Sequence, residues 1–589
     1  MMDTILLTGS VVLAALALAW PLGWYLDMAY SGRRFWVTRF LGPVEAAIYR
    51  VSGIDPAEEM SWKRYALLWL LINLAGGIFL YLLLYFQPFL PLNPQHLGSP
   101  GAGVSFNTAA SFITNTDWQD YSGETALSYF SQVVGLGVQF FMAAANGMVL
   151  AVALSRGFSR AGSTGIGNLW ADLTRTVIYI LLPLAILLSL MLISQGAIQN
   201  FSPYLRVHLI QPFLDAGRLV THQTLAMGPA GSQTAIEILG NNGGGFFNAN
   251  AGHPFQSPTG MTNWMLMVGM LLLPFSLVFY FGRATGNRKI AFSLMGVVLL
   301  LFVPLAILSQ QQDLQGNPVF HALGVTQANQ AQLAGGGNME GVEDRFGAGA
   351  SALFGAIATG TSTGAANSAY DSFMPMSGFV NLFLMQLGEV APGGVGSGLA
   401  SLVGFFVISV FLGSLMVGRT PEFLGKKLEA YEMKMASLSI LVMPVLVLVG
   451  SAIAVSLPGG RAAILNPGPH GFSEILYAIT SPANNNGSAF GGLDADTVFY
   501  NVLTGILVLL NRYLAYFPLL AIAGSLATKK RMTATAGTLN AATPLFAIFS
   551  AVVILLVGAL NFIPALALGP VAEQLSLPAL HVPAALHRG

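Results

Sequence analysis

Apolar runs of about 20 residues recur along the chain and are separated by short polar segments, the pattern of a membrane protein with many crossings. The seventh run is too long for one crossing and is interrupted by APGGVGSG at 391–398. Such a break is tolerated inside a membrane only against protein or a water-filled path. We predict ten crossings, near Ile5–Leu26, Tyr65–Phe86, Leu127–Leu154, Thr176–Ile198, Met261–Phe281, Ile290–Leu308, Met374–Met416, Leu438–Leu457, Val498–Leu519 and Thr543–Leu566.

Composition supports a polytopic all-α membrane protein. Of 589 residues, 54% are hydrophobic and only 8% are charged, whereas soluble domains carry about 25% charged residues. The chain has no cysteine, which excludes disulfides, thiolate metal sites and cysteine nucleophiles. Its eight histidines are scattered without ligand spacing, so we interpret them as loop and helix-end residues. Asp3 replaces the basic flank of a signal peptide, so we expect the first run to be a retained helix.

The basic residues predict the orientation in the membrane. If the loops alternate between two sides, 19 of the 25 Lys and Arg fall on one side, which should be cytoplasmic. Both termini should then face outward, and the outer side carries 15 acidic and 5 basic residues. Such a face attracts cations. The outer basic residues are Arg206, Arg218, Arg345, Arg461 and Arg588, while Arg512 lies inside a helix.

Four outward loops share one pattern, in which an apolar stretch too short to cross the membrane is followed by a polar tetrapeptide. The stretches read ASFITNTDWQDY, TAIEILGNNGGGFF, FGAIATGTSTGAAN and ILYAITSPANNNGSAF, and successive tetrapeptides lie a little over 120 positions apart. A constant period with helix, re-entrant loop and helix in every unit indicates a fourfold internal repeat. The tetrapeptides are Thr114–Asp117, Gly240–Gly243, Thr361–Gly364 and Asn484–Gly487.

This arrangement is suited to binding a monovalent cation. The partially negative ends of four short helices would point toward one axis. Glycine permits torsions that aim successive carbonyls at that axis, and rings of carbonyls can replace the hydration shell of potassium. Asparagine and threonine side chains would hold the loops by hydrogen bonds. A single Asn–Gly loop is equally typical of an ordinary turn, but four in register favour a selectivity filter.

TNTDWQDYSGE, NNGGGFFNAN and NNNGSAFGGL resemble the potassium-binding A subunit of the bacterial Kdp potassium-transporting P-type ATPase complex, over essentially the whole chain. The resemblance implies a protein of the inner membrane with four helix–pore loop–helix repeats, as in potassium channels and transporters. It also implies three partners: an ATP-hydrolysing P-type B subunit, a single-span C subunit and a small F subunit. The family pattern has asparagine at the position of Asp117 and cysteine at that of Thr363, and Asp117 would add charge at the mouth of the filter. The implied filter residues are Thr114, Asn115, Thr116, Asp117, Gly240, Asn241, Asn242, Gly243, Thr361, Ser362, Thr363, Gly364, Asn484, Asn485, Asn486 and Gly487.

Two charges lie inside the predicted membrane region: Glu389, just before the broken segment, and Arg512, in the middle of a helix. Buried ions in a membrane are costly and usually functional. They either form a static ion pair or line a cavity below the filter, from which the resemblance implies that ions leave sideways toward the ATP-hydrolysing partner. On the second interpretation the loop with Gly393, Gly394 and Gly396 blocks the direct route to the cytoplasm.

Three function classes fit these features. One component of a pump needs no nucleotide site of its own, and the chain has neither a phosphate-binding loop nor an Asp-Lys-Thr-Gly-Thr motif, so we expect no catalytic site and no cofactor other than the transported K⁺. A stand-alone potassium channel or ion-coupled symporter is the main alternative, and a broken-helix transporter of organic solutes is the third. Nucleic acid is not an expected partner, and lipid is.

The expected organisation follows the repeats. An N-terminal helix with its cytoplasmic loop (1–60) precedes four pore repeats, and a C-terminal helix with its tail (532–589) follows them. The third repeat contains the broken helix. We expect Gly558 in the last helix to face lipid. The repeats span 61–160, 170–285, 286–436 and 437–531.

Overall fold

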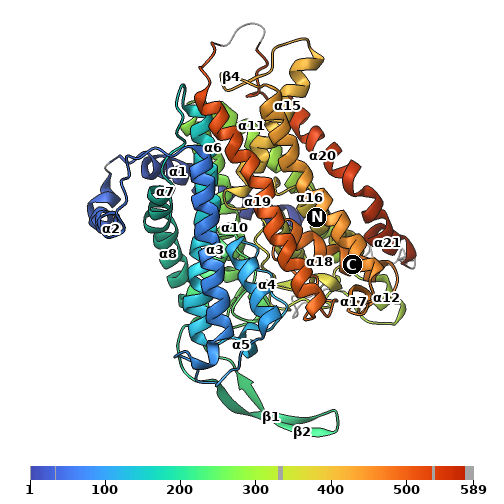
Figure 1. Ribbon diagram of the computed structural model, residues 1–589. Helices are drawn as coiled ribbons and strands as arrows, with labels where there is room; N and C mark the ends of the chain where they lie inside the picture. Colours follow the sequence, from blue (N-terminus) through green and yellow to red (C-terminus); the bar gives the residue numbers. More distant parts are fainter. Residues whose placement is uncertain (1, 34, 329–335, 534–537, 578–589) are drawn as a thin grey trace.

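The computed structural model describes residues 2–33, 35–328, 336–533 and 538–577, so Arg34 and Arg588 of the charge count lie outside it. Ten helices in the described residues are long and apolar enough to cross a membrane, and each coincides with a predicted run. Figure 1 shows them as one bundle with short helices between them. The first crossing is α1 (Met2–Tyr30), and α2 (Trp36–Ser52) lies to one side of the bundle.

The first two repeats each contain two crossings with a short helix between them. The first consists of α3 (Trp62–Tyr85), η1 (Gln87–Phe89), α4 (Ala102–Ile113), α5 (Gly123–Ala126) and a π-helical η2 (Ser131–Gly137) that continues into α6 (Val138–Ser159). The second consists of α7 (Leu169–Arg175), η3 (Thr176–Leu181), α8 (Leu182–Ser194), β1 (Leu205–Asp215), β2 (Arg218–Leu225), α9 (Ala230–Leu239), η4 (Asn250–Gly252) and α10 (Gly260–Ala284).

The last two repeats follow the same order. The third consists of α11 (Arg288–Leu314), α12 (Pro318–Ala322), α13 (Gly347–Gly360), η5 (Tyr370–Ser372), α14 (Pro375–Gln386) and α15 (Ser397–Met416), followed by the short strands β3 (Glu422–Phe423) and β4 (Lys426–Lys427). The fourth consists of α16 (Ala430–Ser456), α17 (Pro458–Arg461), α18 (Pro469–Ala483) and α19 (Val498–Thr528). The chain ends in α20 (Pro544–Leu566), η6 (Ala567–Val571) and α21 (Ala572–Ser576).

The long helices begin at polar capping residues. The side chains of Ser61, Thr259, Thr497 and Thr543 each accept a hydrogen bond from a backbone N–H in the first turn of α3, α10, α19 and α20. Such caps satisfy donors that have no partner inside the helix. They lie where an apolar run begins, and therefore fix where each crossing starts.

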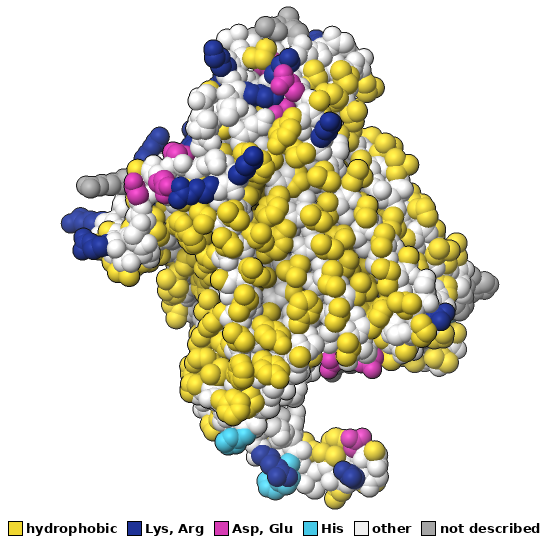
Figure 2. All heavy atoms as spheres, in the orientation of Figure 1, with side chains coloured by type: hydrophobic (Ala, Val, Ile, Leu, Met, Phe, Trp, Pro, Cys, Tyr) yellow, Lys and Arg dark blue, Asp and Glu magenta, His cyan; other side chains and the backbone are white. Residues whose placement is uncertain are grey.

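The second crossing of each repeat is more buried than the first. Within the most apolar stretch of each crossing, 61–89% of the residues are buried in the four second crossings. The corresponding share in the four first crossings is 33–56%. The outermost helices α1 and α20 have only 28% and 39% buried. The bundle is therefore an inner ring of second helices, surrounded by first helices that present apolar side chains to lipid. Figure 2 shows this broad hydrophobic belt, with Lys and Arg gathered at the upper end of the same face.

Two features differ from the expectations. The hairpin β1–β2 was not predicted; its turn uses Ala216 and Gly217 at φ 45° and 79°, the torsions of a tight hairpin turn, and it projects from the bundle (Figure 1). The expectation that Gly558 faces lipid is wrong: it is buried, and a methyl group there would lie 2.9 Å from Leu387 Cδ2. The all-α membrane fold with four pore repeats is otherwise confirmed.

Candidate functional site

Four short helices end at the four tetrapeptides. The helices α4, α9, α13 and α18 are followed immediately by Thr114, Gly240, Thr361 and Asn484, which cap their C-terminal ends. These are the first residues of the tetrapeptides picked out by the spacing in the sequence. The helix ends therefore present their partial negative charge at the start of each polar segment.

Two backbone features recur in all four tetrapeptides. In each one, the N–H of the third residue donates to the carbonyl five residues earlier, at 2.8–3.0 Å. The second residue of each has φ between 48° and 60°, a left-handed conformation that few residues adopt. The second residues are Asn115, Asn241, Ser362 and Asn485. Because this geometry recurs in four loops of different sequence, the repeat seen in the sequence is a repeat of structure.

The loops meet at their glycines. A methyl group on Gly364 would lie 2.5 Å from the Asn486 carbonyl oxygen and 2.7 Å from Gly243 Cα, and one on Gly487 would lie 2.9 Å from Gly243 Cα. No side chain fits there. Gly364 and Gly487 have φ of 67° and 98°, as expected, but the expectation of such a torsion at Gly243 is wrong. In that repeat the next residue, Gly244, has the positive φ of 72°.

Hydrogen bonds between loops hold the ring together. The side-chain amide of Asn115 donates to the Asn241 carbonyl (2.8 Å), and that of Asn241 donates to Thr363 Oγ1 (2.8 Å). The amide of Asn485 donates to Thr116 Oγ1 (2.9 Å). The fourth contact is made by the Asn486 amide, which donates to the Thr359 carbonyl at 3.1 Å. Each loop is thereby joined to its neighbours.

Asp117 is the one charged residue among the four tetrapeptides. It is fully buried, has φ of 52° and lies beside the backbone of Gly243. The contact places a carboxyl group between the first and second loops.

The tetrapeptides separate two cavities. The outer cavity is lined by the last filter residues Gly364 and Gly487 and by the segments that follow the tetrapeptides, with about 1060 Å³ of empty space that includes open solvent. The inner cavity has Asn484, the first residue of the fourth tetrapeptide, in its lining. The tetrapeptides therefore run from the inner cavity to the outer one.

The broken segment of the third repeat lies against the inner end of the filter. The N–H of Gly393 donates to the Gly360 carbonyl at 2.7 Å, and a methyl group on Gly394 would lie 3.3 Å from the Thr361 carbonyl oxygen. Glu389, Gly393 and Gly396 have φ of 58°, 87° and 83°. The loop is fully buried, so it occupies the space directly below the third tetrapeptide.

Glu389 and Arg512 share a tyrosine. The hydroxyl of Tyr516 donates to Glu389 Oε2 at 2.9 Å, and the guanidinium of Arg512 lies over the ring of Tyr516 at 5.2 Å and over that of Trp69 at 5.9 Å. Within the described residues the two side chains form no direct salt bridge with each other. Both side chains are buried, and Glu389 lines the inner cavity.

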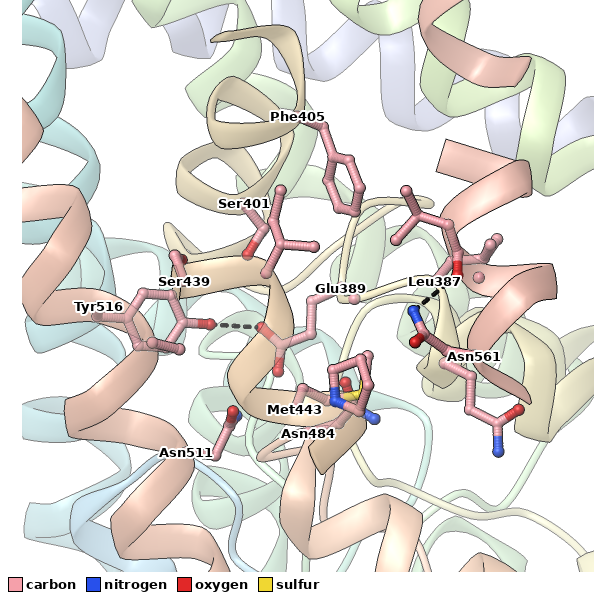
Figure 3. A pocket seen from close by; sticks show the side chains of 17 residues that line it. Leu387, Glu389, Ser401, Phe405, Ser439, Met443, Asn484, Asn511, Tyr516 and Asn561 are labelled. Atoms are coloured by element: carbon pink, nitrogen blue, oxygen red, sulfur yellow. Dashed lines mark hydrogen bonds between the residues drawn. The ribbon is translucent and has the colours of Figure 1, made fainter. Parts of the chain in front are cut away.

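The inner cavity extends from Asn484, the first residue of the fourth tetrapeptide, to residues of α16 and α20 (Figure 3). It has about 520 Å³ of empty space, a figure that includes open solvent, and its lining includes Asn484, Asn511, Tyr516 and Glu389. Ser439 and Met443 of α16 and Gly558 and Asn561 of α20 also line it, and Figure 3 shows Asn561 on the side away from Tyr516. The sequence did not indicate these residues of α16 and α20, because nothing in two apolar helices distinguishes a cavity wall from a lipid-facing surface.

The family model of the potassium-transporting ATPase A subunit (KdpA) matches residues 9–575. The chain belongs to this family. The potassium-transporting ATPase potassium-binding subunit of Sorangium cellulosum is 50% identical over 563 residues, 95% of this chain and 97% of that one. The protein of the same name from Herpetosiphon aurantiacus is 49% identical over 98% of this chain and 99% of that one.

The chain is also similar to a solved structure, that of the potassium transporter TrkH from Vibrio parahaemolyticus. The alignment covers 88% of this KdpA-family chain and 98% of the TrkH chain, with a TM-score of 0.48 and 14% sequence identity. The resemblance expected from TNTDWQDYSGE, NNGGGFFNAN and NNNGSAFGGL is thus confirmed by the family model and the relatives.

Proposed function

We propose that this chain binds K⁺ in the ring of four tetrapeptides and passes it to the inner cavity, as one component of an ATP-driven potassium uptake complex. One observation carries the proposal: four loops that share one backbone pattern meet where Gly243, Gly364 and Gly487 leave no room for a side chain, between two cavities. The proposed ligands are the backbone carbonyls of the sixteen filter residues. The relatives are named as potassium-binding subunits of a potassium-transporting ATPase.

Selectivity follows from the arrangement of carbonyls. A dehydrated ion is stabilised only if several carbonyl oxygens surround it at once, so their positions determine which cation fits. The hydrogen bonds from Asn115, Asn241 and Asn485 fix those positions. The buried Asp117 lowers the free energy of any cation in the filter, and therefore raises affinity more than it changes the choice of ion.

The ion then leaves sideways. The loop at Gly393, Gly394 and Gly396 fills the space below the third tetrapeptide, so a straight path is blocked. The inner cavity instead leads past Glu389 toward α16 and α20. Glu389 attracts the ion into the cavity, and Arg512, which is held over Tyr516, repels it from the space beyond. On this proposal the ATP-hydrolysing P-type partner docks where the cavity reaches the protein surface.

The end of the protein at the top of Figure 2, where Lys and Arg gather, lies in the cytoplasm. The hairpin β1–β2 lies outside the cell. The membrane is the bacterial inner membrane. A single-span partner and a small partner complete the assembly, and ATP is hydrolysed on the P-type partner, since the chain has no nucleotide motif of its own.

Purification of the chain with its co-expressed partners tests the proposal. An ATPase of fixed stoichiometry should co-purify, and K⁺ should raise its rate several-fold while the same concentration of Na⁺ does not. A chain that purifies alone and lets K⁺ cross vesicle membranes without ATP would instead be a channel or symporter, and would refute the proposal.

A further inference from the structure

A histidine with three carboxylates lies next to the outer cavity but is not part of its lining. His470 is the second residue of α18, and its Nδ1 lies 2.8 Å from Glu573 Oε1 of α21. Its Nε2 lies 2.9 Å from Asp371 Oδ1 of η5 and 4.0 Å from Glu474 Oε1. Asp371 and Glu573 are 99 and 103 positions away in the chain, so no sequence spacing could indicate this cluster.

Three of these groups are arranged as metal ligands. The ligand atoms of Asp371, His470 and Glu474 all lie within 4.8 Å of one another. Glu474 is fully buried, and its carboxylate accepts hydrogen bonds from the backbone N–H groups of Leu465 (3.1 Å) and Asn466 (3.2 Å). The site is therefore set before any ion arrives, because the buried carboxylate is held in place by the backbone.

We propose that Asp371, His470 and Glu474 bind a divalent transition-metal ion, best matched by Zn²⁺, and that Glu573 orients the imidazole. A metal-bound histidine typically donates its other ring N–H to a carboxylate. Glu573 takes that role at Nδ1, which leaves Nε2 facing the other two carboxylates.

The ligand set and the spacing both favour zinc. Zinc is bound by nitrogen and oxygen at about 2.0–2.2 Å in a tetrahedron, which puts neighbouring ligand atoms about 3.3–3.5 Å apart. The observed separations lie on both sides of that value: His470 Nε2 is 2.9 Å from Asp371 Oδ1 and 4.0 Å from Glu474 Oε1, and no two of the three ligand atoms are more than 4.8 Å apart. Calcium and magnesium prefer six or more oxygen ligands, and an imidazole favours zinc and its neighbours in the first transition row.

A bound ion would join three parts of the outer surface: η5, which follows the third filter loop; the first turns of α18, which leads to the fourth; and, through Glu573, α21 at the end of the last helix. The ion would therefore stabilise the outer face around two of the four loops. This inference does not depend on potassium binding in the filter, and its test reads neither transport nor ATP hydrolysis.

A pair of histidines outside the proposed site must be replaced before the test. His208 and His222 are paired across the hairpin β1–β2, with ring centroids 4.0 Å apart. Two adjacent imidazoles at an exposed position can chelate a metal on their own. All measurements therefore use the H208N/H222N background, in the purified complex, with any affinity tag of histidines cleaved off.

The probe is Co²⁺, which occupies zinc sites and reports tetrahedral binding by its visible absorption. We expect one Co²⁺ per chain, displaced by Zn²⁺. The variants Asp371→Asn and His470→Gln should each weaken binding at least tenfold, and Glu573→Gln should weaken it about 10- to 100-fold while leaving all three ligands in place. His321→Gln, at an exposed histidine of α12, is the matched control and should bind Co²⁺ as the background does.

Two results would overturn the inference. The first is that the folded background protein shows no tetrahedral Co²⁺ spectrum. The metal is added at about 100-fold excess, a concentration at which even weak protein sites are filled. The second is an unchanged spectrum and affinity in Asp371→Asn and Glu573→Gln. Since these two variants change single atoms, they remain decisive even if His470→Gln does not fold.

Discussion

Glu389 accepts a 2.9 Å hydrogen bond from the hydroxyl of Tyr516, and this contact, rather than a salt bridge to Arg512, holds the buried carboxylate in the inner cavity. The carboxylate lies in a membrane interior where an unpartnered charge is costly. Tyr516 is therefore a structural part of the route that we propose for the ion.

Removing this hydroxyl should destabilise the protein. In Tyr516→Phe the Glu389 carboxylate loses its donor, which should cost about 1–3 kcal/mol and lower the temperature of thermal unfolding. Tyr513→Phe is the matched control: the hydroxyl of Tyr513 is buried without a hydrogen-bond partner within the described structure, so its removal should be close to neutral. Equal unfolding temperatures for the two variants would contradict this account.

Arg512→Met should leave the complex assembled but change the number of ions moved per ATP hydrolysed. The positive charge is buried beside Trp69 and Tyr516 rather than paired with Glu389. The double variant Arg512→Met with Glu389→Gln should therefore not recover what each single change loses, as it would for an ion pair. Recovery of wild-type coupling in the double variant would argue for direct pairing.

Alanine at the filter glycines should weaken potassium binding. Gly364→Ala places a methyl group 2.5 Å from the Asn486 carbonyl oxygen at a φ of 67°, so one or more carbonyls must move. We expect a higher K⁺ concentration for half-maximal ATPase activity and poorer discrimination against Rb⁺. Gly9→Ala in α1 is the control, since no atom lies within 4 Å of the added methyl group. Unchanged affinity and selectivity in Gly364→Ala and Gly487→Ala, at normal expression, would mean that the four loops are not the filter.

The orientation can be read from thiol labelling of this cysteine-free chain. Cysteines at Lys427 and Lys530, both exposed, should resist an impermeant thiol reagent in intact cells, whereas a cysteine at the exposed Gln211 of the hairpin should react. The physical reason is that the basic loops stay in the cytoplasm. The reverse pattern would place every filter loop on the wrong side.

The loop after the second tetrapeptide should lose stability in acid. His253 stacks on Phe247 with ring centroids 3.7 Å apart, and burial, together with the charge of Arg345, lowers the pKa of His253 to about 4. Because its pKa is lower in the folded protein than in the unfolded chain, this contribution is fully present above about pH 6.5 and is lost as the pH falls toward 4.

The unfolding temperature, measured from pH 7 to pH 4, should therefore fall more steeply for the wild type than for His253→Asn. The asparagine oxygen can still accept the hydrogen bond that the backbone N–H of Phe255 donates to His253 Nδ1, but it does not titrate. Parallel curves for the two proteins would show that His253 does not contribute to the acid sensitivity.

The sequence by itself determined the ten crossings, the four repeats and the position of each tetrapeptide. These features depend on local patterns: an apolar run of sufficient length must cross the membrane, and a short helix that ends in polar residues must turn back. The period of the repeats then established that the four loops are equivalent. Even the break in the seventh run could be predicted, because the run was too long and too rich in glycine for one helix.

Only the tertiary structure decided which distant residues meet. The sequence left open whether Glu389 pairs with Arg512 or lines a cavity, and the structure bonds it to Tyr516, whereas Gly558 was expected in lipid but lies beside the inner cavity. Asp371, His470 and Glu573 converge from three segments about 100 positions apart. The physical reason is the same in each case: within a membrane, lipid-facing and protein-facing apolar surfaces have the same composition, so the pattern along the chain does not specify how the helices pack.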